Sequence, residues 1–243
     1  MKIEIDTHTH SIASLHAYST IDELVYGAEK HGLRGFVLTE HGPALHGGLP
    51  HPYYFGNLQV LPHEIRGIKL FRGVELNIMD ENGGLDLPVK YLKILDFVMA
   101  GLHEACFTPA SKDKNTRAML AAIENPFVDC ISHPGNPAYP VDYEKVVKAA
   151  TRCGKALEIN NSSFKVRKGS DENCKTIARL AKAYGCLTSC GSDAHYREDV
   201  GRFDAAQAVI EEAGIGGKQL INSTLEDFTE FYKRRRAERK RHG

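Results

Sequence analysis

The chain has 243 residues, of which 42% are apolar and 26% charged, and its 31 basic and 31 acidic side chains cancel to a net charge of zero. This length suits one large α/β domain or two small ones. No run of 18 apolar residues occurs, and Met1 leads into a charged, alternating segment instead of an apolar leader. We therefore expect a cytoplasmic protein that does not associate with a membrane.

The zero net charge conceals a basic C-terminal segment. Residues 233–241 carry seven basic side chains and one acidic one, which leaves 24 basic and 30 acidic residues elsewhere, a formal charge of −6. An acidic body argues against a broad nucleic-acid-binding surface. We expect the tail, about 233–243, to be the solvated end of the last helix, where basic residues match the helix dipole; contact with nucleic acid is the alternative.

Short apolar runs alternate with segments of helical periodicity along the whole chain. Seven runs are predicted to be buried strands: 3–7, 35–39, 70–75, 95–101, 128–132, 156–160 and 187–191. Helices are predicted at 20–31, 58–67, 114–124, 142–152, 171–184 and 202–213, with N-terminal signals at Thr20, Asp142 and Asp171. Residues 43–56 are predicted to form an irregular loop, and 82–84 a turn that could close a small hairpin. This βα alternation, without linker or repeat, predicts a single domain over 1–243 with a parallel sheet.

A polar side chain stands at or just past the C-terminal end of every predicted strand. These residues are His8, His41, Glu75, His103, His133, Asn160 and Asp193, at intervals of 27 to 34 residues. In a closed barrel all strand ends meet at one mouth. In an open sheet the outermost ends would lie too far apart to share a site, because neighbouring strands are about 4.8 Å apart. The placement favours a closed barrel over a doubly wound sheet.

The first strand ends in Asp6-Thr7-His8-Thr9-His10. Alternate residues of a strand share a face, so His8 and His10 could grip one divalent cation, although either could be a structural histidine instead. The six cysteines form no C-x-x-C pair, and we expect small buried thiols in a reducing compartment. Imidazole and carboxylate donors without thiolate are typical of a catalytic zinc, manganese or iron site with open positions.

Six motifs together resemble the PHP (polymerase and histidinol phosphatase) family. They are Asp6-Thr7-His8-Thr9-His10, Thr39-Glu40-His41-Gly42, Gly73-Val74-Glu75, Gly101-Leu102-His103-Glu104, Ile131-Ser132-His133-Pro134-Gly135 and Gly191-Ser192-Asp193-Ala194-His195. The stretch 158–163, Glu-Ile-Asn-Asn-Ser-Ser, is similar to the YcdX-type phosphatases of that family. The resemblance runs from residue 1 to about 230, and the motifs recur in family order.

This resemblance implies a distorted (β/α)7 barrel with a trinuclear metal site at its C-terminal mouth, usually zinc and sometimes manganese or iron. By position, the first metal would be held by His8, His10, Glu75 and Asp193. Glu75 would bridge to a second metal held also by His103 and His133. The third would be held by His16, His41 and His195. The sequence departs from the family at Glu40, where Asp is common, and the family's closest relatives imply a homo-oligomer, a trimer.

The implied activity is hydrolysis of a small phosphomonoester by attack of a metal-activated hydroxide on phosphorus. Three divalent ions and two carboxylates would leave about +4 at the mouth, which suits a phosphate dianion. Asp193 is expected to orient the water and Glu75 to bridge metals. Arg167, with Lys168 beside it, could bind the phosphate or be solvated loop charge. The alternatives are amidohydrolase-type cleavage of an amide or lactone and a non-catalytic metal-binding PHP module.

The remaining histidines receive structural predictions. His46 and His51 are expected on the surface of the 43–56 loop, with lining of the substrate pocket as the alternative. His31 and His63 are expected at ordinary helix positions, and His242 in the tail.

Overall fold

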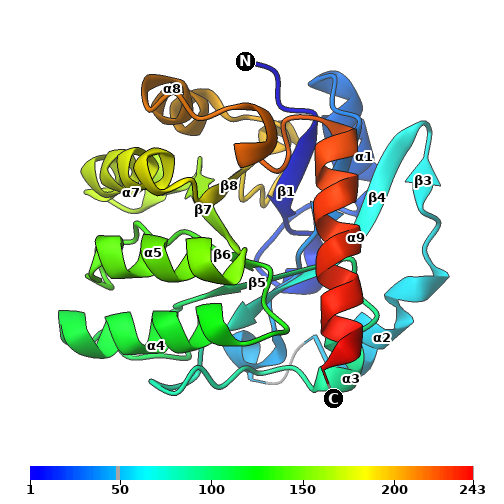
Figure 1. The fold of residues 1–243 in the computed structure, drawn as a ribbon. Helices are drawn as coiled ribbons and strands as arrows, with labels where there is room; N and C mark the ends of the chain where they lie inside the picture. The colour runs from blue at the N-terminus through cyan, green and yellow to red at the C-terminus, as the bar shows by residue number, and fades with distance from the viewer. Residues whose placement is uncertain (48–49, 243) are drawn as a thin grey trace.

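The computed structural model describes residues 1–47 and 50–242, and its strands curve into one barrel (Figure 1). Seven strands lie side by side in chain order, and each neighbouring pair is parallel. They are β1 (Ile5–Thr9), β2 (Gly35–Leu38), β4 (Ile68–Asn77), β5 (Phe97–Gly101), β6 (Cys130–Ile131), β7 (Ala156–Asn160) and β8 (Leu187–Gly191). All seven predicted strands are therefore confirmed, although β6 is shorter and β4 longer than predicted.

The two outer strands of this order, β1 and β8, close the barrel through loop and side-chain contacts. Just past the strand ends, Thr9 bridges to Ala194 and the Asp193 N–H donates to the His8 carbonyl at 2.9 Å. Lower in the seam, the Asn222 amide donates to the carbonyls of Ile5 and Cys190, at 2.7 and 2.8 Å. Because a side chain replaces part of the strand ladder, the barrel is closed but irregular, which confirms the predicted distorted (β/α)7 barrel.

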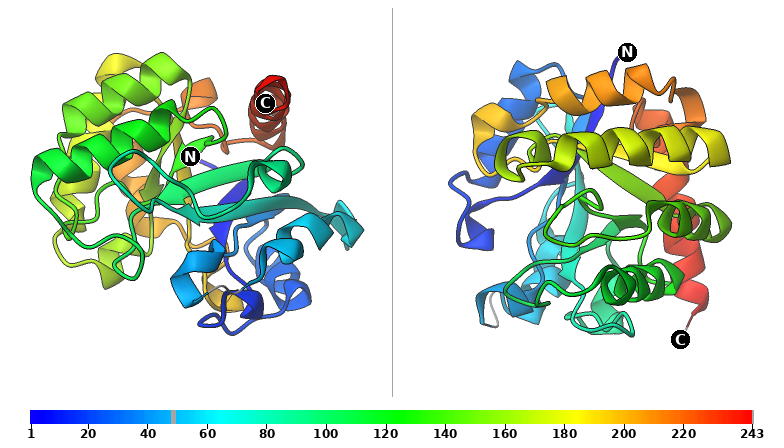
Figure 2. Two further views of the ribbon diagram at one scale, coloured as in Figure 1. Left: turned by 90° about the horizontal axis from the view of Figure 1, so that it is seen from below. Right: turned by 90° about the vertical axis from the view of Figure 1, so that its left-hand side faces the viewer.

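Helices cover the outside of the barrel, as Figures 1 and 2 show from three directions. The longer ones are α1 (Ile21–Lys30), α4 (Lys112–Glu124), α5 (Tyr143–Cys153), α7 (Ser170–Tyr184), α8 (Asp204–Glu212) and α9 (Leu225–Arg241). Thr20 and Asp142 cap α1 and α5 as predicted, whereas Asp171 lies in the first turn of α7 and Gly169 takes the cap position. The helices α4, α5, α7 and α8 stack along one side, and α9 lies beside this stack and runs in a different direction (Figure 1).

The predicted helix 58–67 is wrong. The chain instead forms α2 (Pro52–Asn57), a 3-10 turn at Leu58–Val60 and the short strand β3 (Glu64–Ile65), which pairs antiparallel with β4. Pro62 lacks an N–H and interrupts helical hydrogen bonding. Arg66 and Gly67, with φ of 50° and 83°, form the tight turn into β4. The predicted irregular loop 43–56 likewise contains a 3-10 turn at Pro43–His46 and most of α2, while residues 48–49 lie outside the described chain.

Two further short helices were not anticipated by periodicity, α3 (Val89–Leu92) and α6 (Ser163–Val166). The predicted turn at 82–84 does close a small hairpin, because Ile78 bridges antiparallel to Leu85 and the Met79 N–H donates to the Gly84 carbonyl at 2.8 Å.

The lower half of the barrel is filled by apolar side chains from the strands and from α9. Ile5, Phe71 and Phe97 point inward from the strands and pack with Phe228 and Phe231 of α9. The rings of Phe71 and Phe228 meet edge to face, with centroids 4.9 Å apart. The N-terminal end of the barrel is thus closed by α9, and polar residues converge at the other end.

The basic tail is not simply solvated, so that expectation is wrong for two of its arginines. Arg239 is fully buried and Arg235 is 3% exposed, and both guanidinium groups pair with the buried carboxylate of Asp129. Arg239 also donates to the carbonyls of Leu92 and Leu95, at 3.2 and 2.6 Å. The basic C-terminal part of α9 therefore docks through one face, because Asp129 and the carbonyls of Leu92 and Leu95 meet it at the base of the barrel.

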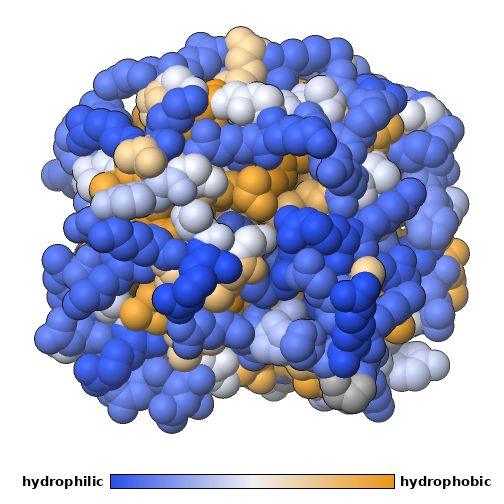
Figure 3. Space-filling view, viewed as in Figure 1, coloured by the Kyte–Doolittle hydropathy of each residue, from blue (hydrophilic) through white to orange (hydrophobic). Residues whose placement is uncertain are grey.

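The surface and the cysteines agree with an ordinary globular protein. Hydrophilic residues predominate over the helices in the view of Figure 3, and apolar residues show between the helices. No helix in the described part of the chain is long and apolar enough to cross a membrane. All six cysteines are free, and four of them are buried, as predicted: Cys130, Cys174, Cys186 and Cys190.

Candidate metal centre

All nine predicted ligands lie at the carboxyl ends of the barrel strands. They are His8, His10, His16, His41, Glu75, His103, His133, Asp193 and His195. Most are buried, whereas His103 and His195 are partly exposed and His16 is exposed. Residues up to 187 positions apart in the chain therefore share one mouth, because parallel strands present the same end to it.

Four of these residues surround a space the size of a metal ion. Nε2 of His8 lies 3.0 Å from Nε2 of His10, 3.2 Å from Oε2 of Glu75 and 3.5 Å from Oδ1 of Asp193. Nε2 of His10 lies 3.5 and 3.4 Å from the same two oxygens. Bonds of about 2.0–2.2 Å to a tetrahedral ion place neighbouring donors about 3.3–3.6 Å apart. Three of the five distances fall in that range, and the two shorter ones, 3.0 and 3.2 Å, both involve Nε2 of His8.

Glu75 directs its second carboxylate oxygen at a different pair of imidazoles. Oε1 lies 2.8 Å from Nε2 of His133 and 3.3 Å from Nε2 of His103, while Oε2 faces the first group. Glu75 is fully buried, and its position two residues before the end of β4 fixes its carboxylate between the two sets. One side chain is thus shared by two groups of donors.

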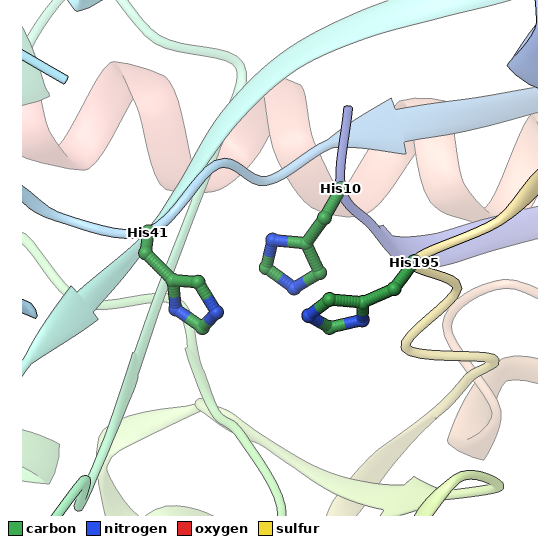
Figure 4. Close-up of side chains that lie close together, drawn as sticks. All are labelled: His10, His41 and His195. Atoms are coloured by element: carbon green, nitrogen blue, oxygen red, sulfur yellow. The ribbon is translucent and has the colours of Figure 1, made fainter. Parts of the chain in front are cut away.

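The remaining histidines form a third gathering that overlaps the first. Figure 4 shows His10, His41 and His195 pointing toward one another, and their ligand atoms lie within 4.8 Å of each other. Nε2 of His16 lies 2.9 Å from Nε2 of His195. His41 also turns Nδ1 to Oε2 of Glu75, at 3.0 Å. The predicted third set is therefore brought together, but His41 lies between it and the shared carboxylate.

The protonation states of the cluster follow from burial and from its mixture of charges. Burial and neighbouring imidazoles hold the pKa of His10 well below its usual range, and burial lowers the pKa of His41 to about 4. Burial opposes the charge of Glu75, but the surrounding histidines outweigh it and keep the pKa of its carboxyl well below the usual range. Carboxylates around His8, led by Glu158, outweigh burial and raise the pKa of that imidazole. Neutral imidazole and ionised carboxylate are the forms that bind metal, and a bound cation would oppose the extra proton on His8.

Glu40, the position where the sequence departs from the resembling family, does not face the cluster. Its buried carboxylate accepts hydrogen bonds from the hydroxyls of Ser11 and Ser14, and Oγ of Ser14 lies 3.1 Å from Nδ1 of His10. Burial raises the pKa of Glu40 to about 7. The longer Glu side chain thus reaches two serines and acts on His10 only through Ser14.

Arg167 reaches the site from the loop after α6. It is partly buried, its Nη1 lies 3.3 Å from Oδ2 of Asp193, and the same nitrogen donates to Oγ of Ser163 at 3.0 Å. Arg167 therefore touches a predicted ligand and lines a cavity at the mouth, whereas Lys168 is exposed and does not line that cavity.

The secondary histidines lie away from the cluster where the structure describes them. His51 is exposed and its Nδ1 accepts from the Tyr53 N–H at the start of α2. His31 ends α1, as expected, but His63 is exposed in the segment before β3, so its predicted helix position is wrong. The side chain of His46 lies outside the described part of the structure.

One buried residue of the site was not singled out by the sequence analysis. Glu158 lies on β7 with its Oε1 2.8 Å from Nδ1 of His8. Its place at the mouth could have been predicted from the sequence, because Glu158 stands two positions before Asn160 and therefore shares the same face of the strand.

A parallel barrel with such a cluster of imidazoles and carboxylates at the carboxyl ends of its strands is typical of proteins that bind metal ions at a catalytic site. Comparison with known sequences makes this specific: the chain belongs to the PHP domain family, whose defining pattern matches residues 6–241.

Its relatives carry a common name. The chain is 52% identical over 238 residues to a protein of Thermoanaerobacter pseudethanolicus named a probable phosphatase, with 97% of each chain covered. It is 48% identical over 236 residues to a probable phosphatase of Acetivibrio thermocellus, covering 97% of this chain and 98% of that one. Among solved structures, histidinol phosphate phosphatase of Lactococcus lactis, complexed with zinc, L-histidinol and phosphate, superposes with a TM-score of 0.68 at 21% identity, covering 89% and 95%. That likeness confirms the fold.

Proposed function

We propose that the chain is a metal-dependent phosphatase that hydrolyses small phosphomonoesters at a site for three divalent ions, most simply zinc, with manganese or iron as alternatives. The observation that carries the proposal is that the two carboxylate oxygens of Glu75 face different histidines. One oxygen faces His8 and His10, and the other faces His103 and His133. A carboxylate shared in this way is suited to two neighbouring ions.

The proposed ligands are those predicted from the family. His8, His10, Glu75 and Asp193 would hold the first ion, Glu75, His103 and His133 the second, and His16, His41 and His195 the third. The donor set supports this assignment, because imidazole and carboxylate suit zinc, manganese and iron, and the chain offers no thiolate there. Bound ions would supply Lewis acidity, a lowered pKa for water and a clamp for phosphoryl oxygens.

The protein's own groups would bind and orient the substrate around that centre. Arg167 presents a guanidinium to the mouth, and such a group recognises phosphate oxygens through two N–H donors. Asp193 keeps its Oδ2 toward Arg167 and Asn160, which fixes its Oδ1 toward His8 and His10 and would let it orient the attacking water. The phosphatase names of the relatives, at 52% and 48% identity, support this reaction over amide or lactone hydrolysis.

Elemental analysis of gently purified protein, paired with hydrolysis of 4-nitrophenyl phosphate, tests this proposal. We expect close to three divalent ions per chain and loss of hydrolysis on prolonged chelation, restored by zinc or manganese. A reproducible ceiling of two ions that added metal does not change, together with cleavage of a lactone or cyclic amide, would favour an amidohydrolase. Metal binding with no hydrolysis of any ester would indicate a non-catalytic module.

A further inference from the structure

A cavity of about 600 Å³ adjoins the proposed metal centre. Its inner wall includes His16, Asp193 and His195, and Arg167 stands beside them. A phosphoryl group held at the metal centre would therefore direct its leaving group into this cavity. The residues that line the rest of it define which leaving group fits.

The outer wall offers polar groups of both signs that have no partner of their own. Lys165 comes from α6, Asp199 and Arg202 from the segment before α8, and Asp204 from the first turn of that helix. Within the described chain, these four side chains make no ion pair or hydrogen bond. Val166, 62% exposed, is the only side chain of a large apolar residue among the described lining residues, and these include no phenylalanine or tyrosine ring.

This lining favours one class of leaving group over two others. A nucleobase or aryl ring gains its binding energy from apolar and aromatic faces, which the described walls offer only at Val166 and at the imidazoles of the proposed metal centre. A second phosphate would meet Lys165 and Arg202 but also the carboxylates of Asp199 and Asp204. Hydroxyl groups both donate and accept, so a neutral polyol could satisfy the cations and the carboxylates together.

We infer that the substrate is the monophosphate of a sugar or another compact polyol. This inference rests on the proposed phosphatase function and specifies its substrate class. The phosphate is held by the metal centre and Arg167, and the hydroxyl groups of the leaving alcohol bind Asp199, Arg202 and their neighbours.

Steady-state kinetics on a panel of esters tests the inference. For glucose 6-phosphate or glycerol 3-phosphate we expect kcat/KM at least about tenfold above that for AMP, 4-nitrophenyl phosphate and fructose 1,6-bisphosphate. Arg202→Gln and Asp199→Asn should each reduce this preference severalfold, whereas Lys168→Met, an exposed change outside the cavity, should not alter it. Equal or better turnover of AMP or the bisphosphate would overturn the substrate class and leave the phosphatase proposal standing, while no turnover of any ester would refute the latter.

A second, independent observation concerns Glu158, a buried carboxylate that accepts hydrogen bonds on both oxygens. Oε1 lies 2.8 Å from Nδ1 of His8, and Oε2 accepts from the backbone N–H of His133 at 2.8 Å and from the Asn160 amide at 3.1 Å. That amide also donates to Oδ2 of Asp193, at 3.2 Å. One carboxylate thus contacts the proposed ligands His8 and His133 directly and is linked to a third, Asp193, through the Asn160 amide.

The backbone around Glu158 is shaped to keep these contacts. His133 has a φ of 32°, a left-handed conformation that is strained for a non-glycine residue and needs support from its surroundings. A Cβ at Gly191 would lie 2.2 Å from Oε1 of Glu158, so only glycine leaves room for the carboxylate.

We propose that Glu158 is a positioning residue that fixes the ring orientation of His8 and keeps a proton on its Nδ1, so that Nε2 faces the metal site. Glutamine cannot replace it, because its amide has one acceptor oxygen and one NH2 group. Whichever way the amide turns, either Nδ1–H of His8 or the N–H of His133 would face a donor.

Zinc affinity measured by chelator competition tests this role. Glu158→Gln should weaken zinc binding by about 10–100-fold and lower kcat, with Glu172→Gln, an exposed change on α7, as the control. Circular dichroism of the metal-free proteins separates misfolding from mispositioning. Wild-type zinc affinity in folded Glu158→Gln would refute the role of Glu158, whereas a wild-type protein that binds no metal would refute the metal centre itself.

Discussion

Glu75→Gln is expected to abolish nearly all phosphatase activity and to leave about two metal ions or fewer per chain. The substitution preserves volume but removes the negative charge that would lie between the first two ions. It also leaves a single oxygen where the structure uses two, one facing His8 and the other facing His133. Because one partner of a buried cluster is neutralised, the effect should far exceed that of losing an exposed histidine.

His16→Ala is the matched comparison. His16 is exposed and lies at the edge of the cluster beside His195. Its loss should weaken the binding of one ion only, and excess metal should partly restore the activity. Metal content and phosphatase rate are measured on both variants after circular dichroism confirms folding. The proposal that Glu75 is shared by two ions fails if the Glu75→Gln variant keeps the metal content of the wild-type protein and at least half of the wild-type activity.

Removal of the basic tail after Tyr232 is expected to destabilise the whole barrel. From the sequence alone such a truncation would leave activity within a few-fold of the intact chain, because the tail supplies no proposed ligand. The structure reverses that expectation, since Arg235 and Arg239 neutralise Asp129, which is itself fully buried and accepts from the Val98 N–H at 3.0 Å. A buried charge left without its partner costs about 3–5 kcal/mol, a large part of the stability of a domain.

Single substitutions locate this effect more finely. Arg239→Met should lower the free energy of unfolding in urea by several kcal/mol, about 3 or more, because Arg239 is wholly buried and pairs with Asp129. Lys240→Met, the neighbouring exposed residue, should change it by less than about 0.5 kcal/mol. Equal unfolding curves for the two variants, or a soluble truncated protein with normal stability, would show that the tail does not hold the barrel together.

The strand pattern of this barrel is legible in the sequence because it is local. Apolar runs at a βα spacing, each ended by a residue such as His41 or Asp193, report burial and chain direction without knowledge of distant partners. The same residues identified the mouth, since parallel strands carry all their C-terminal ends to one side. The prediction of a helix at 58–67 was wrong because Pro62 and the turn at Arg66-Gly67 outweigh a short helical periodicity.

What the tertiary structure alone decided are the contacts between residues far apart in the chain. Local composition marks 233–241 as solvated, and only the fold brings Asp129 to Arg239 and so buries two of its charges. Likewise, Glu75 is a strand-end carboxylate in the sequence, but its two separate sets of neighbours exist only once β1, β5 and β6 stand around β4. The sequence by itself determined which donor types reach the mouth, whereas the fold decided which atoms face one another, because electrostatic pairing depends on distances that no local pattern contains.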